Sequence, residues 1–253
     1  GITIKANTVT LPYTAKDGKT YELNLIDTPG HVDFSHEVRR SLMSCEGALL
    51  VVDASQGVEA QTVANLYLAM ELGLEIVPVI NKIDLPSADV DRVMEEIDRD
   101  LGLDPFASIQ VSAKMGTGID DLLEAIVTKL PPPKGDPQAP LKALLFDAQY
   151  DAYRGAVLLV RLFDGTLKVP TRVRLMHSDA EHKVEEVGNQ TLKRVPVAQL
   201  SAGEVGYVLA GMKSLAGLAI GDTLTEAERP AAEPVAGYRE AKPVVFSSIY
   251  PMA

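Results

Sequence analysis

Tryptophan is absent from this 253-residue sequence, and it contains one cysteine, Cys45. A single cysteine excludes an intrachain disulfide, so we expect a protein of the reducing cytosol. No apolar run approaches the roughly 20 residues that a membrane-spanning helix needs. The polar–apolar alternation of residues 1–9 is typical of a strand and not of a signal peptide. We therefore expect no integral membrane segment.

Basic residues are also scarce, with 24 lysines and arginines against 35 aspartates and glutamates, for a net charge of −11. The deficit lies in residues 1–139, which carry 11 basic and 22 acidic residues, whereas residues 140–227 carry ten of each. An acidic body is not attracted to nucleic acid by its overall charge. Any contact with RNA must therefore use local patches, for which the neutral second half is the better place.

The first half alternates strands and helices. Two strands, 2–11 and 20–26, flank Asp17-Gly18, a dipeptide that favours a hairpin turn. Apolar residues at helical or strand spacing predict helices over 34–45, 59–72, 89–101 and 118–130, and strands over 48–52, 76–80 and 109–111. We expect the continuous apolar run 48–52 to be buried on both faces. We also expect helix 59–72 to turn one apolar side inward, with Val63, Leu66, Tyr67 and Met70. Such alternation predicts a parallel sheet covered by helices.

A proline-rich stretch then separates two structural regimes. After this stretch, apolar residues no longer recur at helical spacing. Short apolar runs instead predict strands over 141–146, 156–163, 172–176, 183–187 and 206–209. Many short strands of this kind are typical of a barrel or sandwich. We divide the chain into an α/β domain, a linker, an all-β barrel domain, a second linker and the start of a third domain. Their ranges are 1–132, 133–140, 141–227, 228–241 and 242–253.

The first chemical motif, Asp27-Thr28-Pro29-Gly30-His31, follows a predicted strand. Ligands of open α/β sheets bind beyond the carboxyl ends of the strands. Asp27 could hold Mg²⁺ through water there, since Mg²⁺ prefers oxygen ligands. Gly30 would let a backbone N–H approach a terminal phosphate closely. Taken alone, the motif is equally compatible with an ordinary turn between a strand and a helix.

Two further motifs follow later strands. In Asn81-Lys82-Ile83-Asp84, one carboxylate could accept both N–H donors of a guanine edge, which adenine does not offer. Asn81 could meet the other edge of the base, and the Lys82 stem could lie over the ring. In Ser112-Ala113-Lys114, a backbone N–H could reach the guanine carbonyl. Each motif alone could be a polar turn, but their order and common position at strand ends are the pattern of P-loop GTPases.

Residues beside these motifs resemble the translation-factor branch of the GTPases, and most of all the LepA (elongation factor 4) family. The resemblance rests on Gly1-Ile2-Thr3-Ile4, on His31 after Gly30, and on the segments 53–62, 141–163, 205–208, 221–223 and 242–246. It implies that Thr3 of the first switch ligates Mg²⁺ and that His31 positions the attacking water. It also implies GTP and GDP as ligands, and the ribosome, its RNA and its proteins as partners. Contact with tRNA would come through domains not in this sequence.

The same resemblance implies a monomeric, cytoplasmic protein, with peripheral association with the inner face of the cell membrane as a further expectation. The implied fold is an incomplete P-loop-GTPase-type α/β domain followed by an all-β barrel, the translation-factor domain 2. The implied activity is ribosome-dependent GTP hydrolysis in reverse translocation or in ribosome assembly. Another large translational GTPase, of translocase or peptide-release type, and a non-catalytic ribosome-binding module stay as alternatives.

One departure from the family pattern is important. The phosphate-binding loop GxxxxGK[ST] and its strand are absent, since Gly18-Lys19-Thr20 lies in the predicted hairpin and has Tyr13 at the upstream glycine position. This loop supplies the N–H cradle and the lysine that neutralise the β- and γ-phosphates. We therefore expect residues 1–253 alone to bind GTP poorly and to be inactive. We also expect strands beside the missing one to present unpaired edges.

Overall fold

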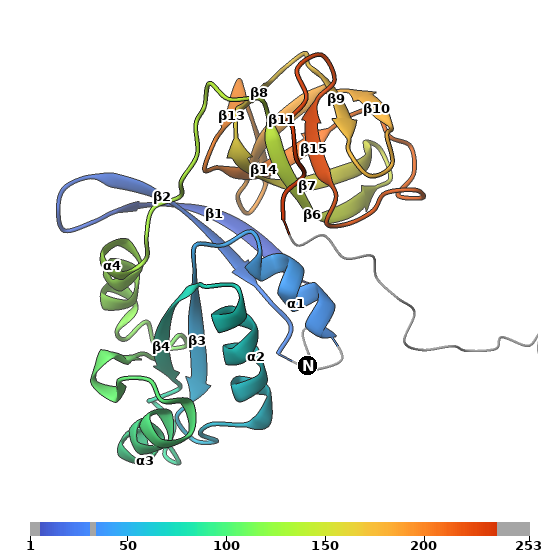
Figure 1. Ribbon diagram of the computed structural model, residues 1–253. Coiled ribbons are helices and arrows are strands. Elements are labelled where there is room, and N and C mark those ends of the chain that lie inside the picture. Colours follow the sequence, from blue (N-terminus) through green and yellow to red (C-terminus); the bar gives the residue numbers. More distant parts are fainter. Residues whose placement is uncertain (1–5, 31–33, 237–253) are drawn as a thin grey trace, which may run out of the picture.

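The computed structural model describes residues 6–30 and 34–236, and it has an α/β part and a β-rich part (Figure 1). Thr3, His31 and the proposed third domain, 242–253, lie outside the described residues. In Figure 1 the β-rich part lies beside one end of the α/β part, and a long hairpin runs along both. Within the described ranges, no helix has both the length and the apolar character needed to cross a bilayer.

A three-stranded parallel sheet lies at the centre of the α/β part. Its order is β3-β4-β5, and β3 and β4 pair in register from Gly47↔Glu75 to Asp53↔Asn81. Helices connect these strands in the manner that parallel pairing requires. The elements are β3 (Gly47–Asp53), α2 (Ala60–Glu71), β4 (Glu75–Asn81), α3 (Val90–Glu96) continued by a π-helix (Ile97–Leu101), a 3₁₀ turn (Pro105–Ala107), β5 (Ile109–Gln110) and α4 (Ile119–Lys129).

The predicted hairpin is present as β1 (Asn7–Thr14) and β2 (Thr20–Asp27), which pair antiparallel along their whole length. The connection turns at Gly18, whose φ of +80° favours glycine. Helix α1 (Ser35–Leu42) then leads into β3. Among the described strands, β1 and β2 pair only with each other, and β3 pairs only with β4. The expectation of unpaired edges is confirmed.

Two burial predictions were wrong for this part. Strand β3 is not buried on both faces: Val52 is fully buried, whereas Val51, on the opposite face, is 56% exposed. On α2, Tyr67 and Met70 are exposed, whereas Leu66 and Ala69 are buried. The spacing of apolar residues predicted the helix correctly. Which face of the helix is buried depends on the neighbouring elements that pack against it.

The β-rich part is an all-β barrel with one interior. An eight-stranded sheet of order β10-β9-β15-β6-β7-β14-β11-β12 and the pair β13-β8 enclose a common cluster of buried apolar side chains. The strands are β6 (Lys142–Asp151), β7 (Gly155–Asp164), β8 (Thr166–Lys168), β9 (Arg172–Leu175), β10 (Glu181–Lys183), β11 (Glu186–Gln190), β12 (Arg194–Val197), β13 (Gln199–Ser201), β14 (Val205–Leu209) and β15 (Thr223–Glu226). The prediction of a single strand over 183–187 was wrong, because β10 ends at Lys183 and β11 begins at Glu186.

The barrel packs against the α/β part through a second apolar cluster. Ile26 of β2 and Met43 after α1 pack against barrel residues that include Leu144 and Phe146 of β6. The buried guanidinium of Arg161 in β7 pairs with Glu46, which lies just before β3. The Asn189 amide also donates to Glu22 of β2 at 3.2 Å. Both apolar and polar contacts therefore join the hairpin and α1 to the barrel.

Candidate functional site

The loops that follow β4 and β5 meet at one edge of the parallel sheet. The two strands pair in parallel at Val79↔Ile109 and Ile80↔Gln110, so their carboxyl ends point the same way. The residues just after them, from Asn81 and from Ser112 onward, are thereby brought together as the sequence predicts. This edge is where open α/β sheets bind their ligands.

Asn81 joins the two loops. Its side-chain oxygen, Oδ1, accepts a hydrogen bond from the backbone N–H of Lys82 at 2.7 Å and another from the N–H of Ala113 at 3.1 Å. An oxygen that already accepts two bonds is engaged within the protein. The direct contact of Asn81 with a base, if made, must therefore come from its NH₂ group.

Asp84 is oriented by Ser112. The Ser112 hydroxyl, which is buried, donates to Asp84 Oδ1 at 2.6 Å, and the N–H of Met115 donates to Ser112 Oγ at 3.1 Å. The Asp84 residue itself is exposed. The carboxylate thus lies at the surface in a fixed orientation, open to a ligand that offers N–H donors.

Lys82 has an unusual backbone for a non-glycine residue, with φ at +65°. Its Nζ lies 2.6 Å from Oδ2 of Asp53, the last residue of β3. Asp53 was not among the residues predicted for the site. The sequence did contain a clue to it. Asp53 directly follows the apolar run 48–52, and a polar residue at the end of a third strand lies at the same edge of the sheet.

The charge of Asp53 is strongly stabilised. Burial alone would raise the pKa of this carboxyl. Hydrogen bonds from Lys82 and from Ser55 outweigh the burial and lower the pKa from 3.8 to about 2. Asp53 is therefore a carboxylate at any physiological pH, and its bond to Lys82 is charge-assisted.

The residues predicted for the phosphate end lie on a different element. Asp27 ends β2 and is exposed, and Gly30 follows it, also exposed. Within residues 6–30 and 34–236, neither makes a hydrogen bond or ion pair to the loops after β4 and β5, and no cluster of three or more candidate metal-ligating side chains occurs. Lys114 is exposed at the rim of the second loop. The described structure therefore brings together the residues predicted after β4 and β5, and it shows no bond between them and Asp27 or Gly30.

Residues 1–132 match the family described as the elongation factor Tu GTP binding domain, which is more than half of the chain. This chain belongs to the translational GTPase family. Residues 155–225 match elongation factor Tu domain 2, in agreement with the β-barrel. The expectations for the family and for the fold class are thereby confirmed.

Individual relatives carry the name elongation factor 4. The chain is 67% identical over 253 residues to elongation factor 4 2 of Rhodopirellula baltica and 61% identical over 253 residues to elongation factor 4 of Syntrophus aciditrophicus. It is 59% identical over 251 residues to elongation factor 4 of Aquifex aeolicus. These matches cover 99 or 100% of the chain but 42% of each relative. The chain thus spans less than half the length of these relatives.

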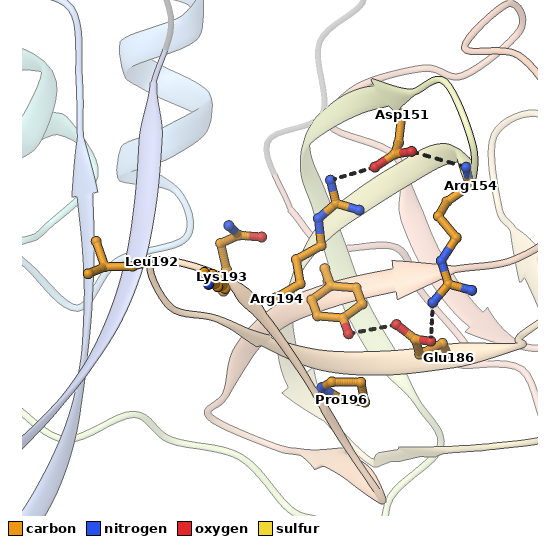
Figure 2. A pocket seen from close by; sticks show the side chains of 9 residues that line it. Asp151, Arg154, Glu186, Leu192, Lys193, Arg194 and Pro196 are labelled. Atoms are coloured by element: carbon orange, nitrogen blue, oxygen red, sulfur yellow. Dashed lines mark hydrogen bonds and ion pairs between the residues drawn. The ribbon is translucent and has the colours of Figure 1, made fainter.

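A hollow of about 520 Å³ on the barrel lies away from this site and is lined by charged groups (Figure 2). Arg154 pairs with Glu186 at 2.7 Å, and Arg194 pairs with Asp151 at 3.1 Å. The Tyr207 hydroxyl donates to Glu186 at 2.8 Å. With Lys193, the lining has three basic and two acidic side chains, and each acidic side chain pairs with one of the arginines.

Proposed function

We propose that this chain supplies the guanine-reading end of a GTP site, together with the domain 2 barrel, of a ribosome-dependent GTPase that acts in translation as elongation factor 4. The observation that carries the proposal is the Ser112–Asp84 hydrogen bond, which fixes an exposed carboxylate beside the loop that Asn81 holds. Action on elongating ribosomes by reverse translocation, or in ribosome assembly, is part of the proposal. It rests on the names of the relatives.

The geometry suits guanine for a specific chemical reason. Guanine offers two adjacent donors, N1–H and the N2 amino group, and one carboxylate can accept both. Ser112 already binds Asp84 Oδ1, so the carboxylate does not have to be ordered when the base arrives. The N–H groups of Ser112 and Ala113 already donate to Thr117 and Asn81, so the N–H of Lys114 would be the one to meet the guanine carbonyl.

The phosphate end of the proposed site uses Asp27, Gly30, Thr3 and His31. Asp27 is an exposed carboxylate at a strand end, and this donor type suits a Mg²⁺ ion that keeps several water ligands. Thr3 would be its protein ligand in the GTP state, and bound Mg²⁺ would neutralise phosphate charge. The N–H of Gly30 would meet the terminal phosphate, and His31 would orient the water that attacks it. Hydrolysis would release Thr3 and Gly30 and relax both switch segments.

We further propose the ribosome as the partner and the cytoplasm as the location, with the domain division 1–132, 141–227 and 242–253 given above. The neutral barrel, with ten basic and ten acidic residues, is less repelled by ribosomal RNA than the acidic α/β part. Residues 1–253 alone should bind GTP weakly, since they lack the GxxxxGK[ST] loop.

The test uses a chimaera in which residues 1–253 replace the matching segment of the Rhodopirellula baltica relative, so that the rest of the relative is retained. In this protein, Asp84→Asn should weaken GDP binding by about tenfold or more, because each charge-assisted hydrogen bond contributes about 1.5–3 kcal/mol. Xanthosine diphosphate, which carries a carbonyl in place of the amino donor, should bind better than before, since the Asn amide can donate to it. Fluorescent-nucleotide titration measures both affinities.

Asp98→Asn is the matched control, because it removes the same charge from an exposed residue outside the guanine loops. Asn at position 84 keeps an oxygen for the Ser112 hydroxyl, so the fold of the loop should survive. Unchanged GDP affinity in Asp84→Asn, with the control also unchanged, would show that Asp84 does not read the base.

A further inference from the structure

The two carboxylate oxygens of Asp53 have separate partners. Oδ1 accepts from the backbone N–H and the hydroxyl of Ser55, at 2.8 and 2.6 Å, and from the N–H of Gln56 at 3.4 Å. Oδ2 accepts from Lys82 Nζ at 2.6 Å. One oxygen therefore holds the loop after β3, and the other is directed across to the loop after β4.

Lys82 is held at both ends of its side chain. At the backbone, its N–H donates to Asn81 Oδ1 and its carbonyl accepts from the N–H of Leu85 at 3.1 Å. At the tip, the ammonium is bound by Asp53. A free lysine side chain has about 2 kcal/mol of rotamer entropy to lose. The tether removes much of this freedom before any ligand binds, because the ammonium is bound at the end of β3.

Asp53 is itself held in a fixed position. It faces Asn81 in the parallel ladder, and the N–H of Ala54 donates to the Asn81 carbonyl at 2.8 Å. Helix α3 then secures the loop that follows: Arg92 donates to the Ser55 carbonyl at 3.1 Å, and Glu96 accepts from the Val58 N–H at 2.9 Å. The ammonium of Lys82 is thus fixed relative to the sheet and not merely to a mobile loop.

The ion pair between Asp53 and Lys82 contributes little to the stability of the fold. The Lys82 side chain is 54% exposed, and exposed pairs contribute only about 0–1 kcal/mol to folding. Lys82 also keeps a backbone conformation that costs a non-glycine residue roughly 1 kcal/mol or more. An unfavourable backbone beside a tethered lysine at a ligand-binding edge is better explained by a role in binding.

We propose that Asp53 is a positioning residue for nucleotide binding, which acts by holding Lys82 so that its aliphatic stem forms one wall of the base site. The proposal rests on the guanine site proposed above. A stem that packs on a ring face contributes equally to any purine base. Asp53 should therefore set affinity without setting base preference, whereas Asp84 should set the preference.

The test is a double-mutant cycle in the chimaera, with Asp53→Asn, Lys82→Met and the double variant. Asn keeps its oxygen for Ser55 and places an NH₂ group, which cannot accept, where Oδ2 binds the ammonium. Met keeps an apolar stem without a charge. Asp53→Asn should weaken GDP and inosine diphosphate by the same factor, between roughly threefold and a hundredfold, the range of coupling between contacting residues. In the Lys82→Met background, Asp53→Asn should change either affinity by less than about twofold.

Asp98→Asn is again the matched control, since it makes the same change at an exposed residue outside the loops after β3, β4 and β5. It should leave both affinities within about twofold of the parent. An Asp53→Asn variant that binds like the parent, or that loses the same affinity with and without Lys82, would overturn the proposal. Failure of the guanine site itself would look different, because Asp84→Asn would then leave the preference for GDP over inosine diphosphate unchanged.

Discussion

At the scale of single residues, the site depends on how polar side chains divide their hydrogen bonds. The side-chain oxygen of Asn81 accepts from two backbone N–H groups, and the Ser112 hydroxyl donates to Asp84. The sequence predicts these residues for the site because their types and spacing suit guanine chemistry. It did not identify Asp53, because the pairing of Asp53 with Lys82 spans 29 positions and depends on the register of β3 and β4.

The lowered pKa of Asp53 makes the stability of the chain depend on pH. In the unfolded chain this carboxyl titrates near 3.8, and in the folded protein near 2. Its contribution is therefore fully present above about pH 4 and is lost as the pH falls toward 2. Because Lys82 is half exposed, we expect Asp53→Asn to cost about 1 kcal/mol at pH 7 and close to nothing near pH 2. Urea unfolding of both proteins across this range measures the difference, and a gap that is constant with pH would contradict the assignment.

At the scale of secondary-structure elements, the connection between β5 and α4 presents the Ser112 loop. Gly116 and Gly118 both have positive φ, at +76° and +73°. A Cβ on Gly118 would lie 2.2 Å from the carbonyl oxygen of Gln110, whereas a Cβ on Gly116 would meet nothing within 4 Å. The tight contact at Gly118 holds the start of α4 against the end of β5.

These two glycines form a matched pair for mutation. Gly116→Ala should cost about 1 kcal/mol, the penalty for a left-handed alanine. Gly118→Ala pays the same penalty and must also separate α4 from β5, so it should cost at least about 1–3 kcal/mol more, as overpacking does. It should also weaken nucleotide binding in the chimaera, because Ser112 pairs with Thr117 in this loop. Thermal unfolding measures the stability, and equal losses in the two variants would contradict this account.

At the scale of the whole molecule, a single buried arginine links the barrel to the α/β part. The Arg161 side chain is 1% exposed, lies over the Phe163 ring at 5.0 Å, and pairs with Glu46, which is 32% exposed. Arg161 also donates to the carbonyl of Leu162. Glu46 lies just after the helix that follows the Asp27–Gly30 motif. The ion pair therefore connects the barrel to the turn between α1 and β3.

Removal of Glu46 should be costly because it leaves a buried guanidinium without its carboxylate. Breaking a buried pair costs about 3–5 kcal/mol, and the partial exposure of Glu46 reduces this to about 2 kcal/mol for Glu46→Ala. Adding Arg161→Met, which removes the stranded charge, should restore most of the loss. Glu181→Ala, which breaks the exposed pair with Arg172, is the control and should cost less than about 1 kcal/mol. If chemical denaturation finds the two glutamate variants equally stable, Arg161 does not depend on Glu46.

The sequence by itself determined the two-part architecture and the alternation of strands and helices in the α/β part, because local spacing is enough to recognise them. It missed half of the barrel strands, and the guanine-site residues stay a prediction. Only the tertiary structure decided which faces are covered, as the exposed Tyr67 of α2 and Val51 of β3 demonstrate. It also decided the pairing of Arg161 with Glu46, 115 positions apart, and the tether between Asp53 and Lys82. Such contacts depend on how distant elements pack, and the physical chemistry of a local segment contains no information about a partner that only folding brings near.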